Sequence, residues 1–192
     1  MIELSDEIAL TQAAQGDQEA FGVLYQRYVN RIYNYIYYRT GNIYDAEDLT
    51  AKVFFRAMRH IPNYKYRGLP FSAWLYRIAH NLVANWHRDS SRRKEIPLED
   101  TIVEKNHVGY PEQELVHLEE RDNLLRLLRS LPPERQQLII LKFVEQSSNA
   151  EIGKIMGKTE GAVKSLYHRT LLSLRDEYQG IASMMNEPQG DG

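Results

Sequence analysis

The sequence contains no cysteine, which excludes a disulfide framework, a thiolate metal site and a cysteine nucleophile. It also has no uninterrupted apolar run approaching the length of about eighteen residues that a membrane-spanning helix needs. The first residues, MIELSDEIALTQ, carry acidic groups where a secretory signal carries basic ones. We therefore expect a cytoplasmic protein that does not insert directly into a membrane.

The six histidines are scattered and lack the paired spacing with carboxylates that is typical of a zinc-binding helix. We expect no metal and no cofactor. Alternating runs of β-branched residues, typical of strands, are also missing, and apolar residues recur instead at helical spacing in almost every segment. The sequence predicts an all-α protein with two small helical domains joined by an acidic flexible linker.

The charge is segregated along the chain, although the formal net charge is only −2. Residues 39–94 hold 11 Lys and Arg against 4 Asp and Glu, whereas residues 95–134 hold 4 against 10. A basic block of this kind is typical of a surface that contacts phosphates, but a solvated helical face has the same composition. Charge by itself leaves both interpretations open.

Helical spacing in the first half predicts a bundle of three or four helices. A short helix closes near Gly16, a long one runs from the capping residue Asp17 to Gly41, a third spans about 44–59, and a fourth runs from Phe71 to about Arg88. Between the last two lies an aromatic and basic loop, 62–70. The inward stripes of the two long helices are expected to be Phe21, Leu24, Tyr25, Tyr28, Ile32, Tyr35 and Ile36, and Phe71, Trp74, Leu75, Ile78, Ala79, Leu82, Val83 and Trp86.

The periodicity fails between about Ser90 and Glu114, where the composition turns acidic, and returns with Leu115. We therefore predict domains at 1–93 and 115–178, an acidic linker at 94–114, and a disordered tail at 179–192. The dipeptide Pro132-Pro133 should end one helix of the second domain, and a short helix should follow it.

The second domain contains a predicted helix-turn-helix. Ser148 and Glu151 have the spacing of a capping box, Gly157 follows that short helix, and Thr159 can cap the next one. The second helix of such a motif enters the major groove of DNA. The candidate DNA-contacting residues are Lys158, Thr159, Glu160, Gly161, Lys164, Ser165, His168 and Arg169. Two helices joined at a glycine also occur in any α-bundle, so the motif does not establish DNA binding by itself.

Two long stretches carry a resemblance to a known family. DAEDLTAKVFFRAMRHI at 45–61 with FSAWLYRIAHNLVANWHR at 71–88 resembles region 2, and SLPPERQQLIILKFVEQSSNAEIGKIMGKTEGAVKSLYHRTLLSLR at 130–175 resembles region 4, of the extracytoplasmic-function sigma factors, group 4 of the sigma-70 family. The resemblance implies an alternative sigma factor, which binds core RNA polymerase and directs transcription from specific promoters. It further implies recognition and melting of a −10 promoter element by the first domain, recognition of a −35 element by the second, and regulation by an anti-sigma factor.

The resemblance also assigns roles to residues. The residues implied to dock on the β′ clamp helices of core polymerase are Asp45, Glu47, Asp48, Leu49, Val53 and Phe54. The resemblance also implies the polymerase β subunit as a partner. Contact with the −10 element falls to the loop residues Asn63, Tyr64, Lys65, Tyr66 and Arg67 and to the helix residues Arg77, His80, Asn81, Asn85 and Arg88. Single-stranded DNA binds to aromatic faces interleaved with cations, which is the composition of this loop. The acidic linker either threads toward the polymerase active-site channel or is a plain tether.

Two other functions compete with this interpretation. A free-standing helix-turn-helix regulator would need no docking helix and no loop for single strands. A nucleic-acid hydrolase would use Asp45, Glu47 and Asp48 with Mg²⁺, but no nearby residues complete such a site. We therefore expect no catalytic residue, no small-molecule substrate and no enzymatic activity.

Overall fold

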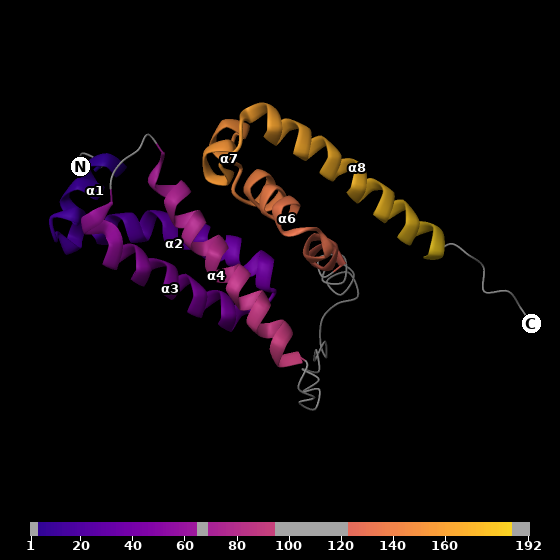
Figure 1. The fold of residues 1–192 in the computed structure, drawn as a ribbon, viewed down its shortest axis with the longest axis horizontal. Coiled ribbons are helices and arrows are strands. Elements are labelled where there is room, and N and C mark those ends of the chain that lie inside the picture. The colour runs from indigo at the N-terminus through magenta and orange to yellow at the C-terminus, as the bar shows by residue number, and fades with distance from the viewer. Residues whose placement is uncertain (1–3, 65–68, 95–122, 186–192) are drawn as a thin grey trace, which may run out of the picture.

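We describe the protein from a computed structural model, which describes residues 4–64, 69–94 and 123–185. All the regular secondary structure in these ranges is helical, and the predicted all-α class is confirmed. Figure 1 shows the N-terminal helices α1 to α4 in indigo to magenta and the C-terminal helices in orange to yellow. None of the described helices combines the length and the apolar character needed to cross a lipid bilayer.

The first two helices begin and end where the sequence places caps. Helix α1 spans Asp6–Ala14 and helix α2 spans Gln18–Thr40. The Asp17 side chain accepts hydrogen bonds from the first free backbone N–H groups of α2, and Gly41 ends that helix in the left-handed conformation with φ 72°. The predicted cap at Asp17 and the predicted end at Gly41 are confirmed.

Helix α3 spans Ile43–His60, the 3-10 turn η1 spans Ile61–Asn63, and helix α4 spans Phe71–Lys94. Helix α4 is longer than predicted, because we expected its end near Arg88. Most side chains from residue 87 to 91 are exposed, so this final stretch has no apolar stripe to mark it as helical.

The core of α1 to α4 follows the predicted stripes, but five of their members are not fully buried. Tyr25 is 43% exposed and packs edge-on against Phe54 at the border of the core, with 4.8 Å between ring centroids. Phe21, Trp74, Ile78 and Trp86 are only partly buried. Tyr25 and the two tryptophans are large and amphipathic, and such side chains fit at the edge of a core.

The C-terminal half has a helical segment at 123–130, then α6 at Pro133–Ile139, the π-helical turn η2 at Ile140–Val144, α7 at Asn149–Met156 and α8 at Glu160–Met185. The break before α6 is confirmed. Helix α8 continues through residues 179–185, where we expected a disordered tail. These residues are mostly good helix formers, so the helix extends beyond its buried part.

The two halves of the molecule pack against each other. Helix α7 contacts α4, and η2 contacts α2. Apolar residues of both halves, including Leu131, Leu138 and Ile152, belong to one buried cluster with those of α2 and α4. The predicted acidic linker, apart from Lys94 at the end of α4, lies outside the described residues.

Candidate nucleic-acid and polymerase interface

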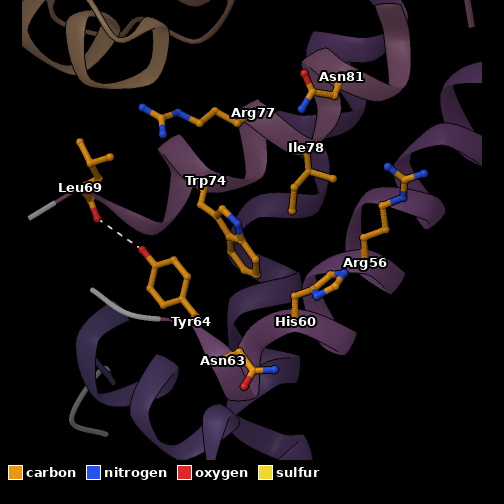
Figure 2. A pocket seen from close by; sticks show the side chains of 9 residues that line it. All are labelled: Arg56, His60, Asn63, Tyr64, Leu69, Trp74, Arg77, Ile78 and Asn81. Atoms are coloured by element: carbon orange, nitrogen blue, oxygen red, sulfur yellow. Dashed lines mark hydrogen bonds between the residues drawn. The ribbon is translucent and has the colours of Figure 1, made fainter. Parts of the chain in front are cut away.

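A pocket of about 680 Å³ opens where η1, α3 and α4 meet. Its volume is within the range of ligand-binding pockets. Figure 2 shows that α3 supplies one wall, α4 another, and the segment around Tyr64 a third. The lining residues are Arg56, His60, Asn63, Tyr64, Leu69, Trp74, Arg77, Ile78 and Asn81.

The aromatic wall of this pocket is held by ring contacts. The Tyr64 ring lies 4.8 Å from that of Trp74 and 6.1 Å from that of Phe71, between centroids. The Tyr64 hydroxyl donates to the Leu69 carbonyl at the long distance of 3.5 Å. A hydrogen bond of this length is weak, and the packed rings form a flat apolar surface of the kind on which a nucleobase stacks.

The polar groups of the pocket lie around that surface. Arg56, His60 and Arg77 are exposed, and so are Asn63 and Asn81. An amide can donate to and accept from the edge of a base, whereas a guanidinium suits a phosphate. The pocket thus combines a stacking surface with cations, the combination that binds single-stranded nucleic acid.

The structure brings together four of the residues predicted to contact the −10 element: Asn63, Tyr64, Arg77 and Asn81 all line this pocket. The predicted loop residues Lys65, Tyr66 and Arg67 lie outside the described residues. Asn85 and Arg88 are exposed farther along α4 and hydrogen bond to each other at 2.7 Å.

His80 differs from the other predicted residues of α4 because it is half-buried rather than outward-facing. Its Nδ1 lies 3.0 Å from an Arg39 guanidinium nitrogen and 3.4 Å from the Tyr35 hydroxyl. Burial lowers the pKa of His80, and the positive charge of Arg39 lowers it further. A guanidinium only donates, so Nδ1 accepts and the neutral ring carries its proton on Nε2.

Sequence reasoning missed part of the pocket. From the sequence, Arg56 and His60 were not predicted to belong to any functional site, and Trp74 was predicted only as a core residue, but all three line the pocket. Arg56 and His60 lie four residues apart and therefore share one face of α3, a weak signal that could have linked them. Nothing in the sequence pairs that face with α4.

The predicted polymerase-docking residues of α3 separate into two groups. Asp45 is half-exposed and Glu47 and Asp48 are exposed, whereas Leu49, Val53 and Phe54 are at most 4% exposed and belong to the core. Their burial removes these three side chains from the candidate docking surface, because the apolar stripe of α3 is used to pack on α2 and α4. The exposed apolar residues of α3, which the sequence analysis missed, are Ile43, Tyr44, Phe55 and Met58.

The predicted capping box of α7 is confirmed. The Ser148 hydroxyl accepts from the Glu151 backbone N–H, and the Glu151 carboxylate accepts from the Ser148 backbone N–H at 2.8 Å. The Ser148 backbone N–H and, at 2.8 Å, the Ser148 hydroxyl both donate to the Glu151 carboxylate, and these two hydrogen bonds lower the pKa of Glu151. Helix α7, the turn that follows it and α8 together form a helix-turn-helix. In the turn Gly157 is left-handed, with φ 69°, and the Thr159 hydroxyl accepts a hydrogen bond from the Ala162 N–H at the start of α8.

Most of the predicted DNA-contacting side chains of this motif lie on one accessible face. Thr159, Glu160, Gly161, Lys164, Ser165, His168 and Arg169 are exposed, and Lys158 is half-exposed. Two of the cations are already paired, Lys158 with Glu134 at 2.7 Å and Lys164 with Glu160 at 2.9 Å. On the opposite side, Val163, Leu166 and Thr170 are buried, so α8 packs through that face and leaves the candidate DNA-contacting residues accessible.

Within the described ranges, no group of three His, Asp or Glu side chains is placed to hold a metal ion. That search included Asp45, Glu47 and Asp48, which all lie on α3.

Comparison with known proteins gives two matches to family models. Residues 24–93 match "Sigma-70 region 2" and residues 121–174 match "Sigma-70, region 4". The chain is 39% identical to the ECF RNA polymerase sigma factor BldN of Streptomyces coelicolor over 85% of its own length, and it spans 62% of that protein. It is 35% identical to the ECF RNA polymerase sigma factor SigE of Mycolicibacterium smegmatis, over 91% of this chain and 70% of that one.

A likeness in fold accompanies the likeness in sequence. The structure of CnrH, solved in complex with the cytosolic domain of CnrY, superposes with a TM-score of 0.67 at 22% identity, covering 91% of this chain and 97% of that one. At this identity the match concerns the fold alone.

Proposed function

The chain belongs to the extracytoplasmic-function sigma factors of the sigma-70 family, and we propose from this that it binds core RNA polymerase and directs transcription from specific promoters. Such a subunit works in the cytoplasm and has no catalytic residues of its own. The observation that carries the proposal is the pairing of a stacking pocket with an exposed helix-turn-helix in a single chain.

The pocket is the proposed site for the −10 element. A base of the single strand would stack on Tyr64 beside Trp74, while Arg56 and Arg77 hold the flanking phosphates. Unstacking a base costs a few kcal/mol, and stacking on an aromatic side chain returns about 1–3 kcal/mol per base. Strand opening can therefore be driven by binding energy without ATP. Residues 1–93 form the proposed domain for this step.

The helix-turn-helix in the proposed domain 115–178 is the candidate site for the −35 element. The exposed residues of the first turns of α8, Glu160, Gly161, Lys164 and Ser165, would face base edges, as in other motifs of this geometry. Lys158 and Arg169 are positioned near the two ends of that face and suit phosphates.

The carboxylates of Asp45, Glu47 and Asp48 form the proposed docking surface for the polymerase. They lie in the first turns of α3 beside the exposed apolar side chains of Ile43 and Tyr44. An acidic rim around an apolar patch suits a partner helix that carries basic residues. The likeness to the family also implies an anti-sigma factor that masks these surfaces, and we propose one as a regulatory partner.

Run-off transcription tests the proposal. Purified chain is mixed with bacterial core polymerase and a library of promoter templates, and core polymerase without the chain is the control. We expect transcripts from a subset of templates only when the chain is present. If the chain neither binds core polymerase nor starts transcription on any template, while it binds duplex DNA alone as a dimer, the free-standing regulator replaces this proposal.

A further inference from the structure

A second pocket, of about 460 Å³, lies between α1 and η1. Helix α1 contributes Glu7, Leu10, Thr11 and Ala14 to its lining, and the other side is formed by Pro62 of η1 and by Tyr64. We call it the α1 pocket. Among the described residues, Tyr64 alone lines both the α1 pocket and the pocket of Figure 2, so the two pockets meet at one aromatic ring.

The first turn of α1, which carries Glu7, is fixed to α2. The Asp6 carboxylate accepts hydrogen bonds from the Arg27 guanidinium and from the Tyr28 hydroxyl. Arg27 also donates to the Leu4 carbonyl at 2.9 Å. Because these contacts hold α1 at its start, the backbone beside the α1 pocket is held in place before any ligand binds.

The Glu7 carboxylate is available to a ligand. The side chain is exposed, and within the described ranges it has no hydrogen-bond or ion-pair partner, whereas the neighbouring Asp6 is paired with Arg27. The Thr11 hydroxyl donates to the backbone carbonyl of Glu7 at 2.8 Å and leaves the carboxylate unoccupied. None of the described lining residues is Lys or Arg, so the α1 pocket suits a group that donates hydrogen bonds and carries no negative charge.

The rest of the α1 pocket is largely apolar and suits a flat ring. Leu10 and Ala14 contribute aliphatic groups, and Pro62 and Tyr64 contribute rings. Figure 2 shows the Trp74 ring beside Tyr64, 4.8 Å away between centroids, so the shared ring is supported from the side of the other pocket. Stacking on an aromatic ring is tolerant of base identity, and selection among bases therefore falls to Glu7.

The chemistry of a carboxylate favours one base. A carboxylate accepts hydrogen bonds and does not donate, and its two oxygens match a pair of parallel N–H donors. Guanine carries such a pair on its Watson–Crick edge, the ring N1–H and the 2-amino group. Adenine and cytosine have one amino donor beside a ring acceptor, and thymine has one donor between two carbonyl oxygens. In a single strand this edge is free to be read.

We propose that the α1 pocket binds a guanine base of the single strand that occupies the pocket of Figure 2, and that Glu7 selects this base. Tyr64 then contacts two bases of one strand. The inference rests on the proposed function for the identity of that strand as promoter DNA. The preference for guanine is a property of the chain alone.

The distribution of charge separates bases from phosphates along this strand. Arg56 and Arg77 line the pocket of Figure 2 and suit phosphates. Glu7 would repel a phosphate at the α1 pocket. The strand backbone therefore follows the arginines, and only an uncharged base enters the α1 pocket beyond Tyr64.

Fluorescence anisotropy of the free full-length chain tests this preference. The ligands are short labelled oligothymidine strands, each with one central guanine, hypoxanthine, adenine or cytosine, at low salt, where the affinity for any strand is greatest. Hypoxanthine differs from guanine only in lacking the 2-amino group. We expect the guanine strand to bind most tightly, about tenfold more tightly than the hypoxanthine strand, because one hydrogen bond to a charged acceptor contributes about that factor.

Variants assign the preference to one carboxylate. In Glu7→Ala the ratio of guanine to hypoxanthine affinity should fall to about one, since the hydrogen bond is lost. Removal of a negative charge by itself would strengthen binding to every strand, so a loss confined to guanine is no general charge effect. Glu7→Gln keeps the size of the side chain but places a donor against a guanine donor, and it should lower the ratio as well.

Two controls accompany these variants. Glu19→Ala removes an exposed carboxylate in the first turn of α2 and should keep the parent ratio. Arg77→Ala, in the pocket of Figure 2, should weaken binding to all four strands and also keep the ratio. Circular dichroism of each variant shows that the helices are retained.

Equal affinity of the parent chain for the guanine and hypoxanthine strands would overturn the inference, and so would a chain that does not bind the guanine strand. A guanine preference that persists in Glu7→Ala and Glu7→Gln would place the base elsewhere and overturn it too. If the strands are not distinguished and Glu7→Ala weakens binding to core polymerase, a basic side chain of the polymerase occupies the α1 pocket instead. Because the strand measurements need no polymerase, a failure of run-off transcription refutes the proposed function and leaves the guanine preference standing.

Discussion

At the scale of single residues, Tyr64 is the position where local packing and the proposed function meet. Its ring packs with Phe71 and Trp74 and forms a wall of the pocket in Figure 2. The sequence analysis chose it for its place in an aromatic and basic loop. The structure adds the neighbouring rings that orient it.

We expect Tyr64→Ala to reduce open-complex formation by about tenfold or more, since stacking of a base on an aromatic ring is worth about 1–3 kcal/mol. Binding to core polymerase should be unchanged. Tyr64→Phe keeps the ring and loses the weak hydrogen bond to the Leu69 carbonyl, so it should retain activity. Permanganate reactivity of the melted strand measures opening, with Tyr178→Ala as a control at an exposed tyrosine of α8. Equal loss in the alanine and phenylalanine variants would contradict a stacking role.

A second residue, His80, makes stability depend on pH. Its pKa is lowered in the folded chain, so below the ordinary value of about 6.5 the unfolded state binds more protons than the folded state. The stability that neutral His80 contributes is therefore fully present above that pH, and it is lost as the pH falls below it toward the lowered pKa of the folded chain. We expect the melting temperature to drop between pH 7.5 and pH 5.5, and to drop less in His80→Asn. If the melting temperature dropped equally in both chains, the effect would belong to other groups. The first of these to test is His87, because burial and Arg39 also lower its pKa.

At the scale of elements, the turn between α7 and α8 depends on a glycine inside a helix. A Cβ added at Gly153 of α7 would lie 2.7 Å from the Lys158 carbonyl oxygen. That contact is closer than atoms tolerate, and the oxygen belongs to the backbone, so the turn itself would have to move. Gly157 was predicted from the sequence as the turn residue, whereas the role of Gly153 depends on the packing of the turn against α7.

We expect Gly153→Ala to destabilise the protein by about 1–3 kcal/mol, the usual cost of overpacking. Gly161→Ala is the matched control, because its Cβ would meet nothing within 4 Å. Gly161 is the second residue of α8, where alanine has helical backbone angles without strain, so this change should leave the stability unchanged or raise it by less than about 1 kcal/mol. Urea unfolding of both variants measures the difference. A Gly153→Ala chain as stable as the parent would show that the turn can shift freely.

At the scale of the whole molecule, the segregated charge separates the proposed partners. The basic stretch 39–94 contains all the residues that line the pocket of Figure 2, and three of its four carboxylates lie in the first turns of α3. DNA and polymerase would thus meet different faces of the same bundle. The C-terminal half adds a second proposed DNA-contacting face, and it packs on the N-terminal half through the contacts of Glu145 with Arg31 and of Arg39 with Gln136.

We expect Asp48→Arg to weaken binding to core polymerase by roughly tenfold or more, because it reverses a charge at the rim of the docking surface. Asp48 is exposed and pairs only with the neighbouring Lys52 among the described ion pairs. The free energy of unfolding should therefore change by less than about 0.5 kcal/mol. Fluorescence anisotropy with core polymerase measures the affinity, and Asp176→Arg on α8 is the control. A similar defect in both variants would indicate a general charge effect.

The helical class, the caps at Asp17 and Ser148, and the turn at Gly157 could all be predicted from the sequence, because each depends on residues within one or two helical turns of one another. Which side chains remain available to a partner followed instead from how the helices pack. That packing buried Val53 and Phe54, turned His80 toward Arg39, and assembled the pocket from α3 and α4. Periodicity shows that a helix has an apolar face, but which partner covers that face depends on contacts between segments far apart in the chain.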